Sequence, residues 1–188
     1  MNKSLFTISG TPLAGLQIVQ RSLHKDTRGY FCRFFCAEEL HTAGIKKPIA
    51  QINHTLTYKA GTVRGLHYQH PPHGEVKLVS CLKGEIFDIA VDLRHNSPTF
   101  LHWHGEVLSE ANFKSLLILE GFAHGYQTLT DDCALIYLHT ESYHPEAEGA
   151  FNIADPRLAI KWPLEIMGMS DRDRQHPFIT QNYQGILL

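Results

Sequence analysis

Alternation of apolar and polar residues dominates the chain from about residue 48 to residue 140. In the predicted strand at residues 85–93, every second residue from Phe87 to Leu93 is apolar, and Asp88 and Asp92 fall on the opposite face. Turn-forming residues recur about every 8–12 positions, which is typical of an all-β sandwich or barrel. The predicted strands are residues 5–8, 16–19, 30–35, 49–57, 62–68, 75–81, 85–93, 103–108, 115–119, 126–128 and 134–140.

Helix is expected in only two places. Residues 37–41 predict one short helix that ends near Gly44, and Ser170 is a suitable N-cap for another. No strand–helix–strand alternation appears, which argues against a Rossmann sheet. We therefore expect one domain over residues 1–188, with a β core at about 16–163 and a C-terminal helical segment at about 164–188.

Length and charge narrow the class of protein. A chain of 188 residues predicts a single domain with a sizeable core, and a net charge of −2 argues against nucleic-acid binding through bulk electrostatics. Neither a secretion signal nor an apolar run of 18 residues is found, so we expect no membrane span. The four cysteines lack a CxxC pair and predict reduced thiols in a cytoplasmic protein.

The stretch Arg64-Gly65-Leu66-His67-Tyr68-Gln69 carries the strongest candidate chemistry, because it combines an imidazole with a nearby cation. Strict alternation predicts that His67 and Gly65 share one strand face, with Arg64 on the other. Gly65 leaves room for a close approach to His67. An imidazole in the mouth of a β-barrel can act as a general base if a carboxylate orients it, although a hydrogen-bonded structural histidine fits the pattern as well.

Metal binding is the competing interpretation, because His67, His70, His73 and Glu75 lie within nine residues. Metal-binding cupins use a His-x-His pair, whereas His67 and His70 are three positions apart and should face opposite sides of a strand. We therefore expect no functional metal at these residues. A metal-dependent or non-catalytic cupin, such as a sugar-binding module, remains the alternative of a different class.

Two further residues stand out. Glycines at both ends of residues 121–125 predict a tight loop that presents His124. Tyr137 lies in the middle of a predicted strand, where its phenol can be core packing or a general acid. Spacing does not decide which carboxylate orients a histidine; the candidates are Asp88, Asp92, Asp155, Asp171 and Asp173.

Short motifs recur in one order along the chain from about residue 16 to residue 175. They are Asp26-Thr27-Arg28-Gly29-Tyr30-Phe31, Gln51-Ile52-Asn53, Arg64 to Gln69, Lys77-Leu78-Val79, Asp88 to Arg94, Ser97-Pro98-Thr99, Glu120 to Gly125, Asp155-Pro156 and Trp162-Pro163. With these motifs nearly the whole chain resembles the dTDP-4-dehydrorhamnose 3,5-epimerase family. That resemblance implies a cupin-like jelly roll, a homodimer, no metal or cofactor, and epimerisation of a nucleotide-diphospho-4-keto-6-deoxy sugar at C3, C5 or both. An isomerase acting at one carbon only, or on a CDP- or GDP-linked sugar, is the alternative within the same fold.

The resemblance also implies roles for individual residues. His67 is similar to the base, Asp173 to the carboxylate that orients it, Tyr137 to the acid on the opposite face, and Lys77 to the cation that stabilises the enolate at C4. Substrate-contacting positions fall on Arg64 (near the diphosphate), His124, Glu148 and Arg172, and nucleotide- or sugar-holding positions on Arg28, Phe31, Gln51, Asn53 and Tyr143. Arg33 stands where the family usually has a Glu that contacts the base, so the nucleotide is left open.

Overall fold

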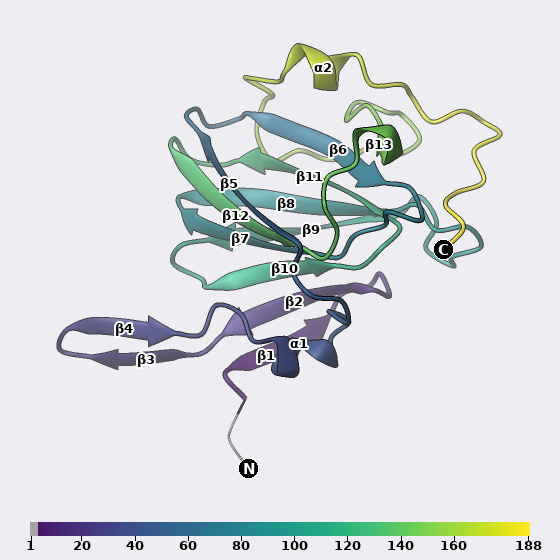
Figure 1. The fold of residues 1–188 in the computed structure, drawn as a ribbon. Coiled ribbons are helices and arrows are strands. Elements are labelled where there is room, and N and C mark those ends of the chain that lie inside the picture. The colour runs from purple at the N-terminus through teal and green to yellow at the C-terminus, as the bar shows by residue number, and fades with distance from the viewer. Residues whose placement is uncertain (1–3) are drawn as a thin grey trace.

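The computed structural model describes residues 4–188, and most of its regular secondary structure is antiparallel strand. Two large sheets face each other, as predicted for a jelly-roll sandwich (Figure 1). The six-stranded sheet has the order β1-β2-β10-β7-β12-β5, and the five-stranded sheet has the order β13-β6-β11-β8-β9. The strands are β1 (Phe6–Gly10), β2 (Leu16–Arg21), β3 (Leu23–Asp26), β4 (Gly29–Cys32), β5 (Gln51–Thr57), β6 (Val63–Gln69), β7 (Lys77–Lys83), β8 (Glu85–Asp92), β9 (Trp103–Ser109), β10 (Lys114–Ile118), β11 (Phe122–Thr128), β12 (Cys133–His139) and β13 (Glu148–Ala150).

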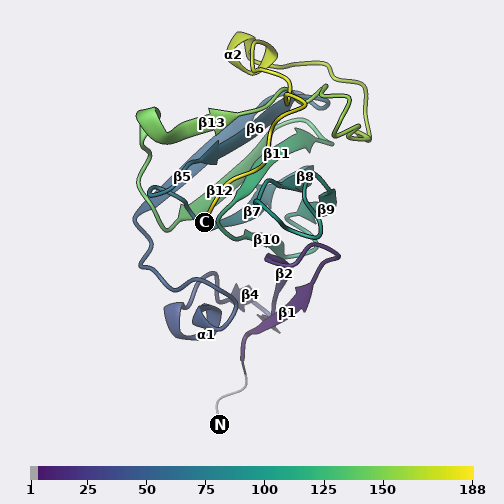
Figure 2. The ribbon, with the colours of Figure 1, turned by 90° about the vertical axis from the view of Figure 1, so that its right-hand side faces the viewer.

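Three apolar clusters hold the layers together. The central cluster lies between the sheets and joins residues such as Ile86 and Tyr126 to Val79 and Leu135. A second cluster lies on the outer face of the five-stranded sheet, where residues 151–186 cover it. A third covers the outer face of the six-stranded sheet with helix α1 (Ala37–His41). Figure 2 shows α1 and the C-terminal helix α2 (Asp171–Arg174) at opposite ends of this stack.

The predicted alternation in residues 85–93 is confirmed in β8. Its odd-numbered apolar residues pack under the C-terminal segment, whereas Ile86 and Ala90 point between the sheets. Asp88 and Asp92 are fully buried on that inner face, because both sides of β8 are covered. A buried carboxylate requires hydrogen-bond partners, and these partners define two of the polar networks of the molecule.

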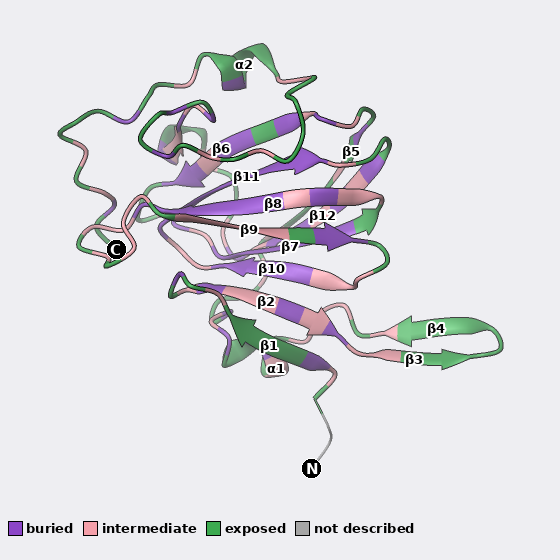
Figure 3. Cartoon of the chain, turned by 180° about the vertical axis from the view of Figure 1, so that it is seen from behind, coloured by how far each residue is buried: buried purple, intermediate pink, exposed green. Residues whose placement is uncertain are grey.

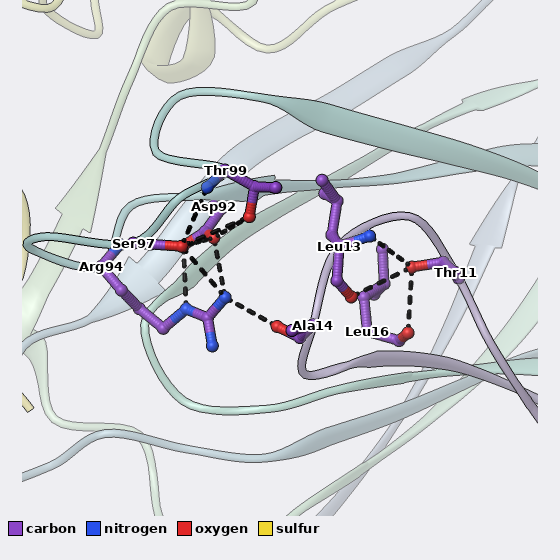
Figure 4. A network of polar contacts seen from close by, with 8 residues as sticks. All are labelled: Thr11, Leu13, Ala14, Leu16, Asp92, Arg94, Ser97 and Thr99. Carbon is purple, nitrogen blue, oxygen red and sulfur yellow. Dashed lines mark hydrogen bonds and ion pairs between the residues drawn. The ribbon is translucent and has the colours of Figure 1, made fainter.

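Asp92 anchors the turn that follows β8 (Figure 4). It accepts hydrogen bonds from Arg94, Ser97 and Thr99. Arg94 also donates to the backbone oxygen of Ala14 over 2.6 Å, which ties this turn to the loop before β2. The matching stretches at residues 88–94 and 97–99 therefore stabilise this turn.

The structure corrects several local predictions. The neighbouring predicted strands 75–81 and 85–93 do not form a hairpin, because β7 and β8 belong to different sheets and Gly84 carries the chain from one sheet to the other. Residues 30–35 are strand only as far as Cys32, and β4 pairs with β3, which was not predicted. Of the C-terminal segment expected to be helical, only the four residues of α2 are helix. The predicted Ser170 cap is confirmed, since its hydroxyl accepts from the backbone N–H of Asp173 over 3.0 Å.

The β3–β4 hairpin extends away from the two sheets, and Figure 3 shows it as an exposed arm beside largely buried strands. Cys81 and Cys133 are buried, Cys32 and Cys36 are half-buried, and all four are free thiols. No helix within residues 4–188 has the length and apolar character required to cross a membrane.

Candidate active site

A polar cavity lies between the two sheets, and its centre is His67. Three adjoining hollows of about 330, 220 and 410 Å³ all have His67 in their walls. The first two also share Asn53, Lys77 and His139. Strands β5, β7 and β12 supply one wall and β6 and β11 the other, so residues from both sheets face a common space.

His67 is paired with a carboxylate from the far end of the chain. Its Nε2 lies 2.9 Å from Oδ1 of Asp173, the third residue of α2. Burial alone would raise the pKa of Asp173, but the hydrogen bond and charge of His67 hold that pKa below its ordinary value. A carboxylate only accepts hydrogen bonds, so this contact selects the neutral tautomer of His67 with the proton on Nε2 and the lone pair on Nδ1. The His67 side chain is 34% exposed, and the cavity therefore reaches it.

The predicted faces of β6 are wrong. Arg64 and His67 lie opposite Tyr126 and His124 of β11, so three steps along β6 match two steps along β11. Gly65 and Leu66 thus form a β-bulge, and the extra residue returns Arg64 and His67 to the same face. A Cβ at Gly65 would come within 2.6 Å of the Gly125 backbone, which explains the glycine.

Arg64 is an exposed cation at the edge of this cavity. Its Nε donates to the hydroxyl of Thr57 over 3.2 Å. Within residues 4–188 no carboxylate forms an ion pair with it, and its side chain lines two of the three hollows. Its charge is therefore available to an anionic group such as a diphosphate.

Tyr137 faces His67 from the opposite sheet. Both residues line the hollow of about 220 Å³, with Tyr137 on β12 and His67 on β6. Tyr137 is 9% exposed and belongs to the central cluster, so its ring is part of the core even though it also lines this hollow. Burial raises the pKa of Tyr137 well above its ordinary value, which keeps the phenol protonated and able to donate.

Lys77 is held by a buried network that the sequence did not predict. Its Nζ lies 3.0 Å from Glu75, whose other oxygen lies 2.6 Å from Nδ1 of His139. Burial acts to raise the pKa of Glu75, but the charge of Lys77 and the contact with His139 outweigh it and hold that pKa at about 2. A fixed ammonium group beside His67 can stabilise negative charge that develops on a substrate.

His124 lies on a strand, not on the predicted loop. Residues 122–128 form β11, which pairs with β6 on one side and β8 on the other and is buried along its length. Burial on both faces overrides the turn tendency of the two glycines. Nε2 of His124 lies 2.7 Å from Asp88, and burial raises the pKa of this carboxyl despite the opposing effect of His124.

The predicted sugar- and nucleotide-holding residues divide into two groups. Gln51, Asn53, Tyr143 and Glu148 line the hollow of about 330 Å³. Gln51 accepts from the backbone N–H of Tyr143, and the Tyr143 hydroxyl donates to Glu148 over 2.8 Å. Glu148 also forms an ion pair with Arg172, which lines the third hollow. These residues make a continuous polar rim around the opening.

Arg28, Phe31 and Arg33 are not brought into this cavity. Arg28 and Phe31 lie on the β3–β4 hairpin, where Phe31 is 63% exposed and Arg28 pairs with Asp26. Arg33 forms an ion pair with Glu39 of α1. Within one chain, none of the three lines any of the hollows around His67.

Several cavity residues were not predicted. Glu75 and His139 are in the Lys77 network, Gln69, Thr55 and Tyr126 line the walls, and His176 lies 3.4 Å from His67 and 3.3 Å from Asp173. Alternation could have found His139, which shares the face of Tyr137 two residues earlier. His176 had no local signal, because only the packing of the C-terminal segment places it there. Burial and the nearby His67 lower the pKa of His176.

A jelly roll whose cavity holds an oriented imidazole, a buried phenol on the facing sheet and a fixed ammonium group is an isomerase suited to proton transfer at carbon. A family model described as dTDP-4-dehydrorhamnose 3,5-epimerase matches residues 10–181. The chain therefore belongs to the dTDP-4-dehydrorhamnose 3,5-epimerase family.

Individual relatives agree over almost the full length. A curated dTDP-4-dehydrorhamnose 3,5-epimerase of Methanothermobacter thermautotrophicus is 39% identical over 181 residues, 94% of this chain and 96% of the relative. The crystal structure of the Bacillus anthracis dTDP-4-dehydrorhamnose 3,5-epimerase with TDP and PPi bound has a TM-score of 0.89 at 35% identity, covering 93% of this chain and 99% of that one. The Legionella pneumophila dTDP-6-deoxy-D-glucose-3,5-epimerase in complex with dTDP-4-keto-L-rhamnose gives 0.87 at 39% identity and covers 92% of each chain.

Proposed function

We propose that this chain epimerises a nucleotide-diphospho-4-keto-6-deoxy sugar at C3 and C5, with dTDP as the nucleotide. The observation that carries the proposal is the placement of His67 and Tyr137 on facing sheets around one hollow. Inversion at carbon requires removal of a proton from one face and delivery to the other, and two groups on opposite walls suit that requirement. The relatives described above supply the substrate class.

The first step is proton abstraction. Nδ1 of His67 removes the proton from the carbon beside the C4 ketone, and the electron pair moves to the C4 oxygen as an enolate. The ammonium group of Lys77 stabilises that charge, while Asp173 stabilises the imidazolium. A preorganised cation of this kind is worth on the order of several kcal/mol in a water-poor site.

The second step is reprotonation from the opposite face. The Tyr137 hydroxyl donates its proton to the same carbon, and the ketone reforms as the enolate charge returns. The phenolate then takes a proton from solvent and the imidazolium loses one, so the protein returns to its starting state. Arg64 lies at the open side of this cavity and is the residue we assign to the diphosphate.

Solvent exchange tests the assignment. In D₂O, deuterium should enter C3 and C5 of dTDP-4-keto-6-deoxyglucose, and NMR follows each carbon separately. His67→Ala should lower exchange at both carbons by about 10²- to 10⁴-fold. Tyr137→Phe should retain abstraction but lose inversion. His102→Ala, which removes an exposed histidine in the turn before β9, is the matched control.

Three outcomes would change the proposal. If His67→Ala exchanges deuterium as fast as the wild type, His67 is not the base. If the wild type exchanges at one carbon only, the protein is a single-carbon epimerase. Absence of exchange with dTDP-, CDP- and GDP-linked 4-keto sugars alike overturns the function.

We further propose a homodimer in which the β3–β4 hairpin of one copy completes the cavity of the other. Phe31 is exposed on an arm that extends from the sandwich, and Tyr30 beside it stays largely exposed although it packs edge-on against Phe113, so this arm offers an aromatic surface to a partner. The family resemblance assigns Arg28 and Phe31 to the nucleotide, yet neither lines the cavity of its own chain. Both facts are satisfied if the arm reaches a second copy.

Complementation of variants tests this arrangement. A mixture of His67→Ala and Phe31→Ala chains should regain activity after subunit exchange, because a mixed dimer combines native His67 from one chain with native Phe31 from the other. Each variant alone should stay weakly active, and light scattering should give the mass of a dimer. A monomer, or a mixture no more active than its two components, contradicts the arrangement.

A further inference from the structure

His67, Asp173 and His176 form a compact group of three possible metal ligands at the edge of the cavity. Nε2 of His67 lies 2.9 Å and Nε2 of His176 lies 3.3 Å from the same oxygen, Oδ1 of Asp173. The two imidazole nitrogens are 3.4 Å apart, and their rings are almost perpendicular at 89°. Three donor atoms thus converge on one point from three different directions.

These separations match those of a tetrahedral zinc ligand set. With metal–ligand distances of about 2.0–2.1 Å, neighbouring ligands of a tetrahedral ion are about 3.3 Å apart. An ion placed just above the plane of the three donor atoms would therefore contact all three without a large movement of any side chain. Two imidazoles and one carboxylate are also a common protein ligand set for zinc.

The surroundings leave room for a fourth ligand. The hollow of about 410 Å³ is bordered by His67 and Asp173 and opens beside them, so a water molecule can complete the coordination. Arg172 is the nearest cation from α2, and its charge is matched by its ion pair with Glu148. The second histidine and carboxylate group, formed by His73, His144 and Glu146, is less suited, because the two rings stack at 3.7 Å and Glu146 is 69% exposed.

We propose that His67, Asp173 and His176 bind Zn²⁺ or a similar transition-metal ion, and that this ion inhibits proton abstraction by His67. The inhibition rests on the proposed function, whereas the binding does not. In the free protein Nε2 of His67 carries the proton and Nδ1 is the acceptor. A metal on Nε2 requires the neutral ring to carry its proton on Nδ1 instead. The metal-bound tautomer is therefore the one that cannot act as a base.

Metal binding can be measured without any activity. Chelator-treated protein is titrated with Co²⁺, whose visible absorption reports four-coordinate geometry, and Zn²⁺ is then added in competition. Wild type should bind one ion per chain. His176→Ala and His176→Gln should each weaken Co²⁺ binding at least about tenfold. The Gln variant keeps a donor to Asp173, so it covers the case in which the Ala variant fails to fold.

His73→Ala is the matched control, because it removes a histidine from the other candidate group and leaves all three proposed ligands in place. It should bind Co²⁺ like wild type. Loss of binding in His73→Ala but not in His176→Gln, or the absence of a four-coordinate Co²⁺ spectrum in wild type, would overturn the site.

Inhibition is measured separately by the deuterium exchange assay. One equivalent of Zn²⁺ should suppress exchange in wild type, and EDTA should restore it. In His176→Gln the Zn²⁺ concentration that halves the exchange rate should rise at least about tenfold. Bound Co²⁺ or Zn²⁺ with unchanged exchange would overturn the inhibition. If metal-free wild type shows no exchange, the proposed function fails while the Co²⁺ titration still decides the site.

Discussion

The cavity contains two histidine–aspartate pairs with similar geometry and very different surroundings. His67 and Asp173 are 2.9 Å apart, and His124 and Asp88 are 2.7 Å apart. His67 is 34% exposed, whereas His124 is 7% exposed and Asp88 is fully buried. Asp173 also accepts from the backbone, but Asp88 has one oxygen, Oδ2, without a hydrogen-bond partner in the described chain.

The carboxyl pKa values follow this difference. The pKa of Asp173 is lowered because hydrogen bonds and the charge of His67 outweigh burial, and the pKa of Asp88 is raised because burial outweighs His124. The first pair can therefore exchange protons with a substrate and return to its starting state. The second is better suited to fixing the shape of the cavity wall. The same two residue types serve chemistry or architecture according to solvent access and the number of hydrogen bonds.

The largest effect on activity should come from His67. His67→Gln should lower the epimerisation rate by about 10²- to 10⁴-fold, because the general base is lost. The melting temperature should change by only a few degrees, because Asp173 keeps its other hydrogen-bond donors. Steady-state kinetics measures the rate, and thermal unfolding measures the melting temperature. A large loss of stability in His67→Gln would contradict the difference between the two pairs.

The largest effect on stability should come from His124. His124→Ala leaves the buried Asp88 without its partner and should lower the free energy of unfolding by about 3–5 kcal/mol. Chemical denaturation measures the change. The double variant Asp88→Asn/His124→Ala should recover part of the loss, because the amide removes the unpaired charge; additive losses would show that the two residues do not interact.

The pH dependence of stability should reveal Glu75, the carboxylate of a third such pair. Its folded pKa of about 2 lies below the ordinary value of 4.5, so the unfolded chain binds more protons between these two values. Stability should therefore fall by up to about 3 kcal/mol as the pH drops from 4.5 towards 2. Glu75→Gln should be less stable at neutral pH and should lack this part of the slope. If the free energy of unfolding of Glu75→Gln falls with pH as steeply as that of the wild type, other carboxylates cause the loss of stability.

The smallest effect should come from the support of Asp173. Ser170→Ala removes the N-cap of α2 and should cost about 1 kcal/mol of stability. The epimerisation rate should fall less than in His67→Gln, since Asp173 remains present but is held less firmly. Ser170→Asp, which restores a capping oxygen, should recover the rate. If the rate is the same in the wild type and in both variants, the cap does not position Asp173.

The strands were predictable where apolar residues alternate with charged ones, as in β8, or where burial alternates, as in β12. The family resemblance predicted His67, Lys77, Tyr137 and Asp173, and the structure places all four around one cavity. Local patterns could not predict the bulge at Gly65, because a bulge is defined by the register with β11. For the same reason, strict alternation separated Arg64 from His67.

Contacts between distant segments account for the other differences. Gly121 and Gly125 predict a loop around His124, but β11 is buried along its length between two neighbouring strands, and this burial makes the segment a strand. The links from His139 to Glu75 and from His176 to Asp173 depend on sheet order and on how the tail packs, neither of which appears in a local window. The hairpin residues Arg28 and Phe31 are a different case, because their predicted role requires a second copy of the chain.

Asp173 lies beyond the last strand, so the catalytic site is completed only after both sheets have been synthesised. Every strand of both sheets is complete by residue 150, so a growing chain has all parts of the sandwich before α2 is synthesised. Such a chain already holds Lys77 and Tyr137 but lacks the group that sets the tautomer of His67. The site is therefore complete only after Asp173 has been synthesised, and proteolytic cleavage between residues 150 and 171 would remove α2 and silence the site.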